Sequence, residues 1–258
     1  VDDVSLGAIN PESDLQLEVY STTDGGNQIV LANNTKGVGT YWDYGLNKSI
    51  KQQDTVVFPF LGEQSIKFSG FCDGGIITTI RKVTITKIDH VVAPEWAIFA
   101  GKGANGKKWS WDYEKKDDIV YGNGGYLASL RPAWWQVSAG TMETGDFKQV
   151  LSDYMEFDLN GGPNFTKKRA DGSVIEKGTF KFDMSKIKKL GDGNLYAIGE
   201  LQFLDASILF AVAQDDGNKP IFTFDIISLT EDKMVLAYAV PGTGAWGNAY
   251  FWCFKSIK

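Results

Sequence analysis

The stretch Arg81-Lys82-Val83-Thr84-Ile85-Thr86-Lys87-Ile88 alternates apolar and polar side chains, and this alternation decides the fold class. Successive side chains of a β-strand point to opposite faces, so Val83 and Ile85 share one face and the two threonines share the other. One apolar and one polar face is typical of a strand in an antiparallel sheet that covers a core on one side. The stretch therefore predicts an all-β architecture.

Short runs of the same kind recur along the chain, and Asp-Gly and Gly-Gly pairs separate many of them. Such runs, bounded by turn residues, predict strands. The candidate strands are residues 15–20, 55–60, 65–71, 76–88, 109–113, 155–159, 164–168, 178–183, 195–203, 207–212, 221–229, 234–240 and 249–254. Helical spacing of apolar residues is found on Phe147, Val150, Leu151 and Tyr154. We therefore expect many strands and one short amphipathic helix.

The chain divides where the first set of strands ends. The alternating run stops at Asp89 and His90, and Pro94 follows in a short linker. A length of 258 residues is enough for two modest domains, each with its own core. We predict an N-terminal tether over residues 1–13, a first β domain over residues 14–90 and a larger antiparallel β domain over residues 95–258.

Composition argues against several classes of function. The formal net charge is −6, with 26 Lys and Arg against 32 Asp and Glu, whereas a nucleic-acid-binding protein needs a basic face. The chain has no apolar run of roughly 18 residues, so no membrane-spanning helix is predicted. One histidine and two distant cysteines do not have the spacing of a metal site or a histidine-dependent hydrolase. We predict no cofactor, no metal ligands and no nucleic-acid partner, and Ca²⁺ held by scattered aspartates stays an open alternative.

The first domain carries a tryptophan motif that is similar to a known family. Residues 39–45 read Gly-Thr-Tyr-Trp-Asp-Tyr-Gly, and they are followed by Val-Phe-Pro-Phe at residues 57–60 and Gly-Glu-Gln-Ser-Ile-Lys-Phe at 62–68. Over roughly residues 14–89 this resembles the polycystic-kidney-disease (PKD) domain, whose hallmark is a Trp-Asp-Phe-Gly strand followed by a hairpin turn. Tyr44 stands in place of the Phe, and Leu46-Asn47 replaces the Asp-Gly turn. The resemblance implies an Ig-like β-sandwich that packs around Trp42.

The second domain carries short motifs at residues 108–112, 134–135, 154–160, 178–182, 229–236 and 251–254. In this order they resemble the C-terminal domain of cell-surface lipoproteins from glycan-foraging Gram-negative bacteria. The resemblance implies a lectin- or glucanase-like jelly roll or a lipocalin-like barrel. It also implies an exported protein at the cell surface, outer membrane or periplasm, held by a lipid anchor upstream of Val1. An outer-membrane glycan transporter complex is the implied partner.

Tryptophans in polar, Gly-rich surroundings are the candidate ligand contacts. Trp109, Trp111 and Tyr113 alternate along a strand and share one face, which packs on the core or forms an exposed aromatic ladder. Trp134 and Trp135 are neighbours and point to opposite faces, so one ring is expected near the surface. Trp246 lies in a Gly-rich loop. The predicted sugar-stacking residues are Trp111, Trp134, Trp135 and Trp246, each with packing against the core as the alternative.

Two carboxylates on one strand face raise the question of an enzyme. Glu156 and Asp158 resemble the Glu-x-Asp-x-(x)-Glu strand of laminarinase-type glycoside hydrolases, but Asn160 and Gly161 occupy the two possible places of the third carboxylate. We therefore assign no catalytic residue and expect Glu156, Asp158 and Asn164 to form hydrogen bonds with a bound glycan. A solvated strand face is the alternative for these residues.

The sequence predicts a cell-surface carbohydrate-binding protein that captures a polysaccharide or oligosaccharide by aromatic stacking, as an accessory to glycan uptake. The Ig-like domain would act as a spacer. Two other functions remain open. One is a laminarinase-like retaining glycoside hydrolase with Glu156 as its nucleophile, and the other is a structural subunit of an outer-membrane complex that binds no glycan.

Overall fold

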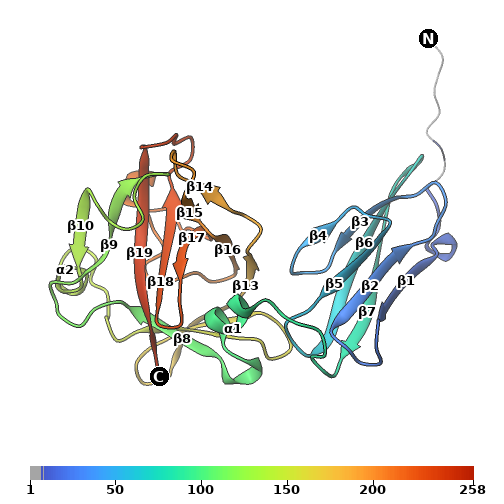
Figure 1. Ribbon diagram of the computed structural model, residues 1–258, viewed down its shortest axis with the longest axis horizontal. Coiled ribbons are helices and arrows are strands. Elements are labelled where there is room, and N and C mark those ends of the chain that lie inside the picture. Colours follow the sequence, from blue (N-terminus) through green and yellow to red (C-terminus); the bar gives the residue numbers. More distant parts are fainter. Residues whose placement is uncertain (1–6, 8) are drawn as a thin grey trace, which may run out of the picture. The chain divides into compact units, whose positions relative to one another are not determined.

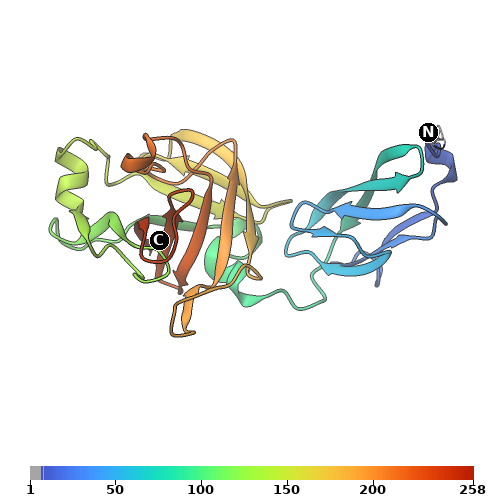
Figure 2. The same cartoon turned by 90° about the horizontal axis from the view of Figure 1, so that it is seen from above.

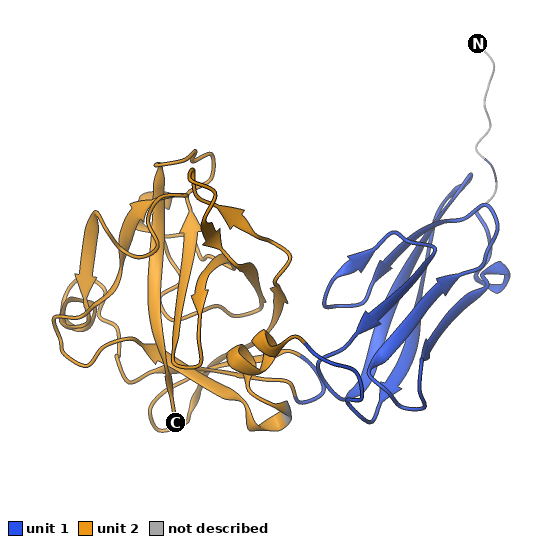
Figure 3. Cartoon of the chain, in the orientation of Figure 1, with its two compact units in different colours: residues 1–92, 160–162 blue, residues 93–159, 163–258 orange. Residues whose placement is uncertain are grey.

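The computed structural model describes residue 7 and residues 9–258. The chain divides into two compact units, residues 1–92 with 160–162 and residues 93–159 with 163–258, which we name unit 1 and unit 2 (Figure 3). Most of the predicted tether, residues 1–6 and 8, lies outside the described residues. Where the predicted tether ends, a 3-10 helix, η1 (Glu12–Asp14), precedes the first strand.

Unit 1 is an Ig-like β-sandwich of two antiparallel sheets (Figure 1). One sheet contains β1 (Leu17–Ser21), β2 (Gln28–Asn33) and β5 (Gln53–Val57) in this order. The other contains β4 (Lys48–Ser49), β3 (Gly39–Asp43), β6 (Gly62–Cys72) and β7 (Gly75–Ile85). Trp42 of β3 is fully buried and packs on Phe68 of β6, with ring centroids 4.7 Å apart. The predicted sandwich around a central tryptophan is confirmed.

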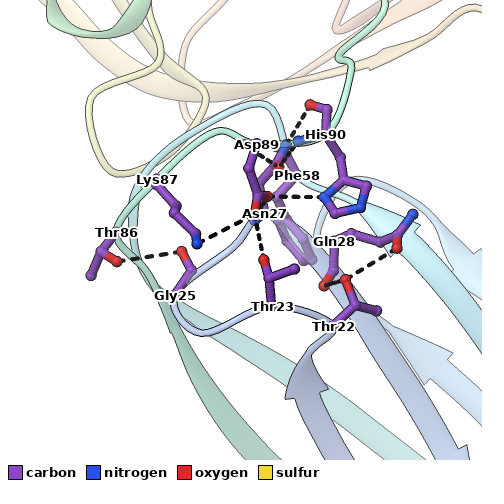
Figure 4. A network of polar contacts seen from close by, with 10 residues as sticks. All are labelled: Thr22, Thr23, Gly25, Asn27, Gln28, Phe58, Thr86, Lys87, Asp89 and His90. Atoms are coloured by element: carbon purple, nitrogen blue, oxygen red, sulfur yellow. Dashed lines mark hydrogen bonds and ion pairs between the residues drawn. The ribbon is translucent and has the colours of Figure 1, made fainter.

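The end of unit 1 is held by the buried side chain of Asn27, which precedes β2 (Figure 4). Asn27 Nδ2 donates to the carbonyl oxygens of Phe58 (2.9 Å) and His90 (3.2 Å). Asn27 Oδ1 accepts from the backbone N–H groups of Asp89 (3.1 Å) and His90 (2.8 Å). Hydrogen bonds from Thr23 and His90 hold the pKa of the Asp89 carboxyl well below its ordinary value. One amide side chain thus fixes the segment that leaves the sandwich.

Unit 2 is built on an eight-stranded antiparallel barrel (Figures 1 and 2). The strands are, in ring order, β8 (Lys107–Trp111), β11 (Tyr154–Asp158), β12 (Asn164–Lys168), β13 (Val174–Asp183), β16 (Gly199–Leu204), β17 (Thr223–Leu229), β18 (Lys233–Ala239) and β19 (Asn248–Ile257). Each pairs with the next, and β19 pairs back with β8 to close the ring. The ring follows the chain order, which is the up-and-down arrangement of lipocalin-like barrels rather than the Greek keys of a jelly roll.

Two further strand pairs belong to unit 2, one attached to the ring and one separate from it. β9 (Ile119–Gly125) pairs with the first half of β19 and carries β10 (Trp135–Ser138) at its other edge, while β8 pairs with the second half of β19. β14 (Lys188–Lys189) and β15 (Leu195–Ala197) form a separate small hairpin.

The helix α1 (Pro94–Ala100) closes one end of the barrel. Phe99 is fully buried, and its ring centroid lies 4.5 Å from that of Phe157 and 4.9 Å from that of Phe182. Trp109 Nε1 donates to the Phe99 carbonyl oxygen at 2.9 Å. Trp109 and Trp111 are both fully buried, so the core interpretation of their strand face is correct and the exposed aromatic ladder is wrong.

The segment 205–222, between β16 and β17, is tied across the other end. Trp252 Nε1 donates to the Phe210 carbonyl oxygen and Tyr121 Oη donates to the Val212 carbonyl oxygen, both at 2.9 Å. Residues 207–212 were expected to be a strand, but Phe210 has a φ of 50°, which no extended strand contains. The segment carries a short 3-10 helix, η3 (Gln214–Asp216).

The predicted helix over residues 147–154 is wrong. Lys148 has a φ of 48° in the left-handed region, which is incompatible with a right-handed helix. The helix that does form there, α2 (Ala139–Thr144), precedes it and begins at Ser138, whose hydroxyl accepts from Thr141 N–H at 3.2 Å. Of the four apolar residues behind this prediction only Leu151 is buried, whereas Val150 is 51% exposed, so their spacing does not mark one buried helical face.

Candidate functional site

The structure places the predicted aromatic residues in two different environments. Trp134, Trp135 and Trp246 are 53%, 37% and 71% exposed. Trp111 is fully buried, and its ring centroid lies 5.1 Å from that of Phe254. The stacking role expected for Trp111 is therefore corrected, because its ring presents no face to solvent.

Trp134 and Trp246 meet over Gly125, the last residue of β9. A Cβ atom on Gly125 would lie 3.2 Å from Trp134 Cζ2 and 3.3 Å from Trp246 Cε3. Two residues that are 112 positions apart therefore bring their rings to the same point of the backbone. A side chain at this position would crowd both rings, which would have to move by a few tenths of an ångström to accommodate it.

Trp246 is held in a strained backbone conformation. Its φ of 64° lies in the left-handed region, which costs a bulky residue about 1–2 kcal/mol. Its N–H donates to the Tyr126 carbonyl oxygen at 2.8 Å, and Tyr126 N–H donates to the Gly247 carbonyl oxygen at 2.7 Å. These hydrogen bonds fix the backbone of a residue whose ring is largely exposed, and such strain is concentrated at functional sites.

Asn123 of β9 fixes the corner that carries the adjacent tryptophans. Its carbonyl oxygen accepts from Trp134 N–H (3.0 Å), and its Oδ1 accepts from Trp135 N–H (3.0 Å). The Trp135 ring packs on Tyr121 and Phe147, with centroids 5.8 Å and 5.9 Å away. Trp135 therefore anchors β10, whereas the ring of Trp134 is the more exposed of the two.

Carboxylates lie beside the two converging rings. Asn248 of β19 is paired directly with Gly125, and residues paired in this way project to the same face. Asn248 Nδ2 donates to Asp215 Oδ2 at 2.7 Å. Asp216 follows in η3, and its Oδ2 accepts from Tyr238 Oη at 2.8 Å. We name Trp134, Trp246, Asn248, Asp215 and Asp216 the aromatic–acidic face.

Two tyrosine hydroxyls support the acidic part of this face. Asp215 N–H donates to Tyr250 Oη at 3.2 Å. Burial is the larger cause, and the hydrogen bond to Asp216 the next, of a rise in the pKa of Tyr238 to about 12. Tyr238 therefore stays a neutral donor over the physiological pH range and holds the Asp216 carboxylate in place.

Glu156, Asp158 and Asn164 lie together, but away from this face. Asn164 Nδ2 donates to Asp158 Oδ1 at 2.7 Å, and Glu156 forms an ion pair with Lys168. The hydrogen bond that Lys168 Nζ donates to the Glu156 carboxylate raises the pKa of Lys168. β11 pairs with β8, which pairs with the second half of β19, whereas Gly125 pairs with Asn248 in the first half. The structure thus separates the predicted polar partners from Trp134 and Trp246.

Four polar residues of the site were missed by sequence reasoning: Asn123, Asn248, Asp215 and Asp216. The sequence marks the last two only through the turn pair Asp216-Gly217. Nothing in the local pattern indicates that the segment 205–222 crosses the end of the barrel. Within the described part of the chain, no three His, Cys, Asp or Glu side chains are grouped to hold a metal ion. No helix among those residues is both long and apolar enough to cross a membrane.

Comparisons with known proteins leave the family open. No family model and no curated protein matches the sequence. Among solved structures, the PKD1 domain of Vibrio anguillarum Epp is similar, with 19% sequence identity and a TM-score of 0.24 over 28% of this chain and 89% of that one.

Proposed function

We propose that this protein binds a saccharide at the aromatic–acidic face of unit 2. The observation that carries the proposal is the pair of exposed indole rings, Trp134 and Trp246, that meet over Gly125 beside Asp215. Indole rings stack on the apolar faces of flat ligands, and each stacked ring contributes about 1–3 kcal/mol in the comparable case of nucleobases. Hydroxyl groups of the same sugar can donate to a carboxylate, which makes the stronger, charge-assisted kind of hydrogen bond.

The position of Trp246 supports this proposal. An exposed ring on a flexible loop loses conformational entropy when it binds, whereas a ring that is already fixed loses less. The two backbone hydrogen bonds between the Tyr126 and Trp246–Gly247 segments supply this fixation. The strained conformation of Trp246 is then part of a preformed binding surface.

The proposal includes a location for the protein. The motifs of unit 2 that resemble surface lipoproteins support a lipid-anchored protein at the cell surface, with unit 1 as a spacer and a glycan transporter complex as the partner. A protease added to intact cells that produce the natural full-length protein should degrade it. Complete protection in intact cells, with degradation after lysis, would contradict this location.

The hydrolase alternative has less support. Its nucleophile would be Glu156, whose carboxylate is engaged in the ion pair with Lys168. The position of the third carboxylate of the laminarinase motif is occupied by Asn160. We therefore do not extend the proposal to catalysis.

Native affinity electrophoresis tests the proposal. The protein is run through gels that each contain one plant, algal or host polysaccharide, and at least one should retard it. Trp134→Ala and Trp246→Ala should each weaken binding about 5- to 150-fold, which corresponds to one lost stacking contact. Tyr20→Ala removes an exposed aromatic ring from unit 1 and should not change the retardation.

Two results would contradict the proposal. If no polysaccharide retards the folded protein, the role of a partner-docking subunit is favoured instead. If both tryptophan variants are retarded as strongly as the wild type, a glycan binds but the aromatic–acidic face is the wrong site.

A further inference from the structure

The charged groups of the aromatic–acidic face carry one sign. Asp215 is exposed and accepts from Asn248, and Asp216 accepts from Tyr238. The cation that approaches them is Lys219, whose Nζ lies 3.7 Å from Asp216 Oδ1 on a largely exposed side chain. In residues 9–258, no ion pair neutralises Asp215. A bound ligand therefore meets a net negative charge here.

Of two basic side chains on the neighbouring elements, one lines a separate pocket and the other forms an ion pair. Arg131, three residues before Trp134, lines a separate pocket with Asp112 and Asp117. Lys188 lies over the Tyr126 ring at 5.3 Å from its centroid, and its Nζ is 2.8 Å from Asp225 Oδ1. Neither cation is available to pair with an anionic ligand at the two tryptophans.

We infer that this face binds a neutral sugar unit and discriminates against uronates and sulfated sugars, an inference that rests on the proposed function. The rings and the carboxylate converge on one residue pair, Gly125 and Asn248, so the sugar unit that stacks also faces Asp215. A hydroxyl at that point donates a charge-assisted hydrogen bond to the carboxylate. A carboxylate or sulfate at the same point adds like-charge repulsion, and an unpaired charge that repels is how a binding site rejects the wrong ligand.

The experiment compares matched ligands that differ only at C6. Neutral glucan, mannan and galactan oligosaccharides are each paired with the derivative whose C6 hydroxyl groups have been oxidised to carboxylates. Dissociation constants are measured by isothermal titration calorimetry at low and high salt. We expect the oxidised member of the bound pair to bind at least about ten-fold more weakly at low salt. The difference should shrink at high salt, because salt screens exposed charges.

Variants assign the discrimination to the carboxylates. Asp215→Asn and the double variant Asp215→Asn, Asp216→Asn keep the hydrogen-bonding shape and should reduce the difference between neutral and oxidised ligands. Asp24→Asn removes an exposed carboxylate from unit 1 and should leave the difference unchanged.

The outcomes separate this inference from the proposed function. An oxidised ligand that binds as tightly as its neutral partner, or more tightly, overturns the inference and leaves saccharide binding intact. A difference that persists in the double variant also overturns it, because the discrimination then has another source. Failure of the folded protein to bind any of these oligosaccharides, or any polysaccharide, overturns both.

Discussion

Replacing Asn27 with Ala should destabilise unit 1 by about 2–4 kcal/mol. The side chain makes four hydrogen bonds, to Phe58 O, His90 O, Asp89 N and His90 N. Each contributes a net amount of about 0.5–1.5 kcal/mol. In the variant, water can replace part of the lost hydrogen bonding at Asp89 and His90, which are half-exposed, whereas the residue Phe58 is buried. The expected loss is a large part of the roughly 5–15 kcal/mol that stabilises a typical domain.

Hydrogen exchange measured by mass spectrometry gives the magnitude for each unit separately. A loss of about 2–4 kcal/mol should raise exchange of the β2 amides about 30- to 900-fold where exchange requires global opening. Peptides from β19 of unit 2 should exchange as in the wild type. Asn34→Ala changes an exposed asparagine that directly follows β2, and surface changes of this kind are usually within about 0.5 kcal/mol. Unchanged exchange of β2, or equal acceleration in β19, would refute this reasoning.

Three further predictions concern the binding face, the cysteines and acid stability. Gly125→Ala should weaken glycan binding several-fold in a folded protein, because the added Cβ crowds the rings of Trp134 and Trp246. Gly191→Ala adds a Cβ in open space and should not weaken binding, and equal affinities of the two variants would contradict the convergence of the two rings on Gly125. Burial raises the pKa of the Cys253 thiol to about 11, so iodoacetamide at pH 8 should label half-exposed Cys72 in the native protein and Cys253 only after unfolding, as read by peptide mass spectrometry. The pKa of Asp89 in the folded protein lies below the ordinary value of 3.8, so the ionised carboxylate stabilises unit 1 above pH 3.8 and this stabilisation is lost as the pH falls below it. Between pH 5 and 2.5 the urea midpoint of unit 1 should therefore fall less in Asp89→Asn than in the wild type, and an identical fall would contradict this.

The strands with alternating side chains were the predictable part of the fold, because they leave a local record, whereas β2 and β9 were not among the predicted strands. The alternation of Val83 and Ile85 with threonines marks β7. Because successive side chains of a strand point to opposite faces, this pattern directly predicts one buried and one exposed face. The positive φ angles at Lys148 and Phe210 leave no such record, since neither residue is a turn-former such as Gly or Asn. Both of the wrong element predictions fall at these two positions.

The candidate site could be predicted only in part. The sequence argument placed both tryptophans on one strand and expected one ring near the surface. In the structure both rings are exposed, and Trp134 lies before β10, which begins at Trp135. The pairing of Gly125 with Asn248 depends on how the barrel closes, and the approach of Asp215 depends on a segment that crosses its end. Barrel closure brings together residues that are far apart in sequence. The sequence analysis could not detect this and assigned Glu156 and Asp158 as the polar partners of the tryptophans instead.

The most direct test of the central claim follows the indole N–H groups during glycan binding. The chain has eight tryptophans, and a protein labelled with ¹⁵N at the indole nitrogen gives one signal for each, assigned by single Trp→Phe substitutions. When the polysaccharide that retards the protein is added as an oligosaccharide, the signals of Trp134 and Trp246 should shift with the same dissociation constant, while that of fully buried Trp42 stays fixed. Binding that leaves the signals of Trp134 and Trp246 unchanged would contradict the assignment of the aromatic–acidic face.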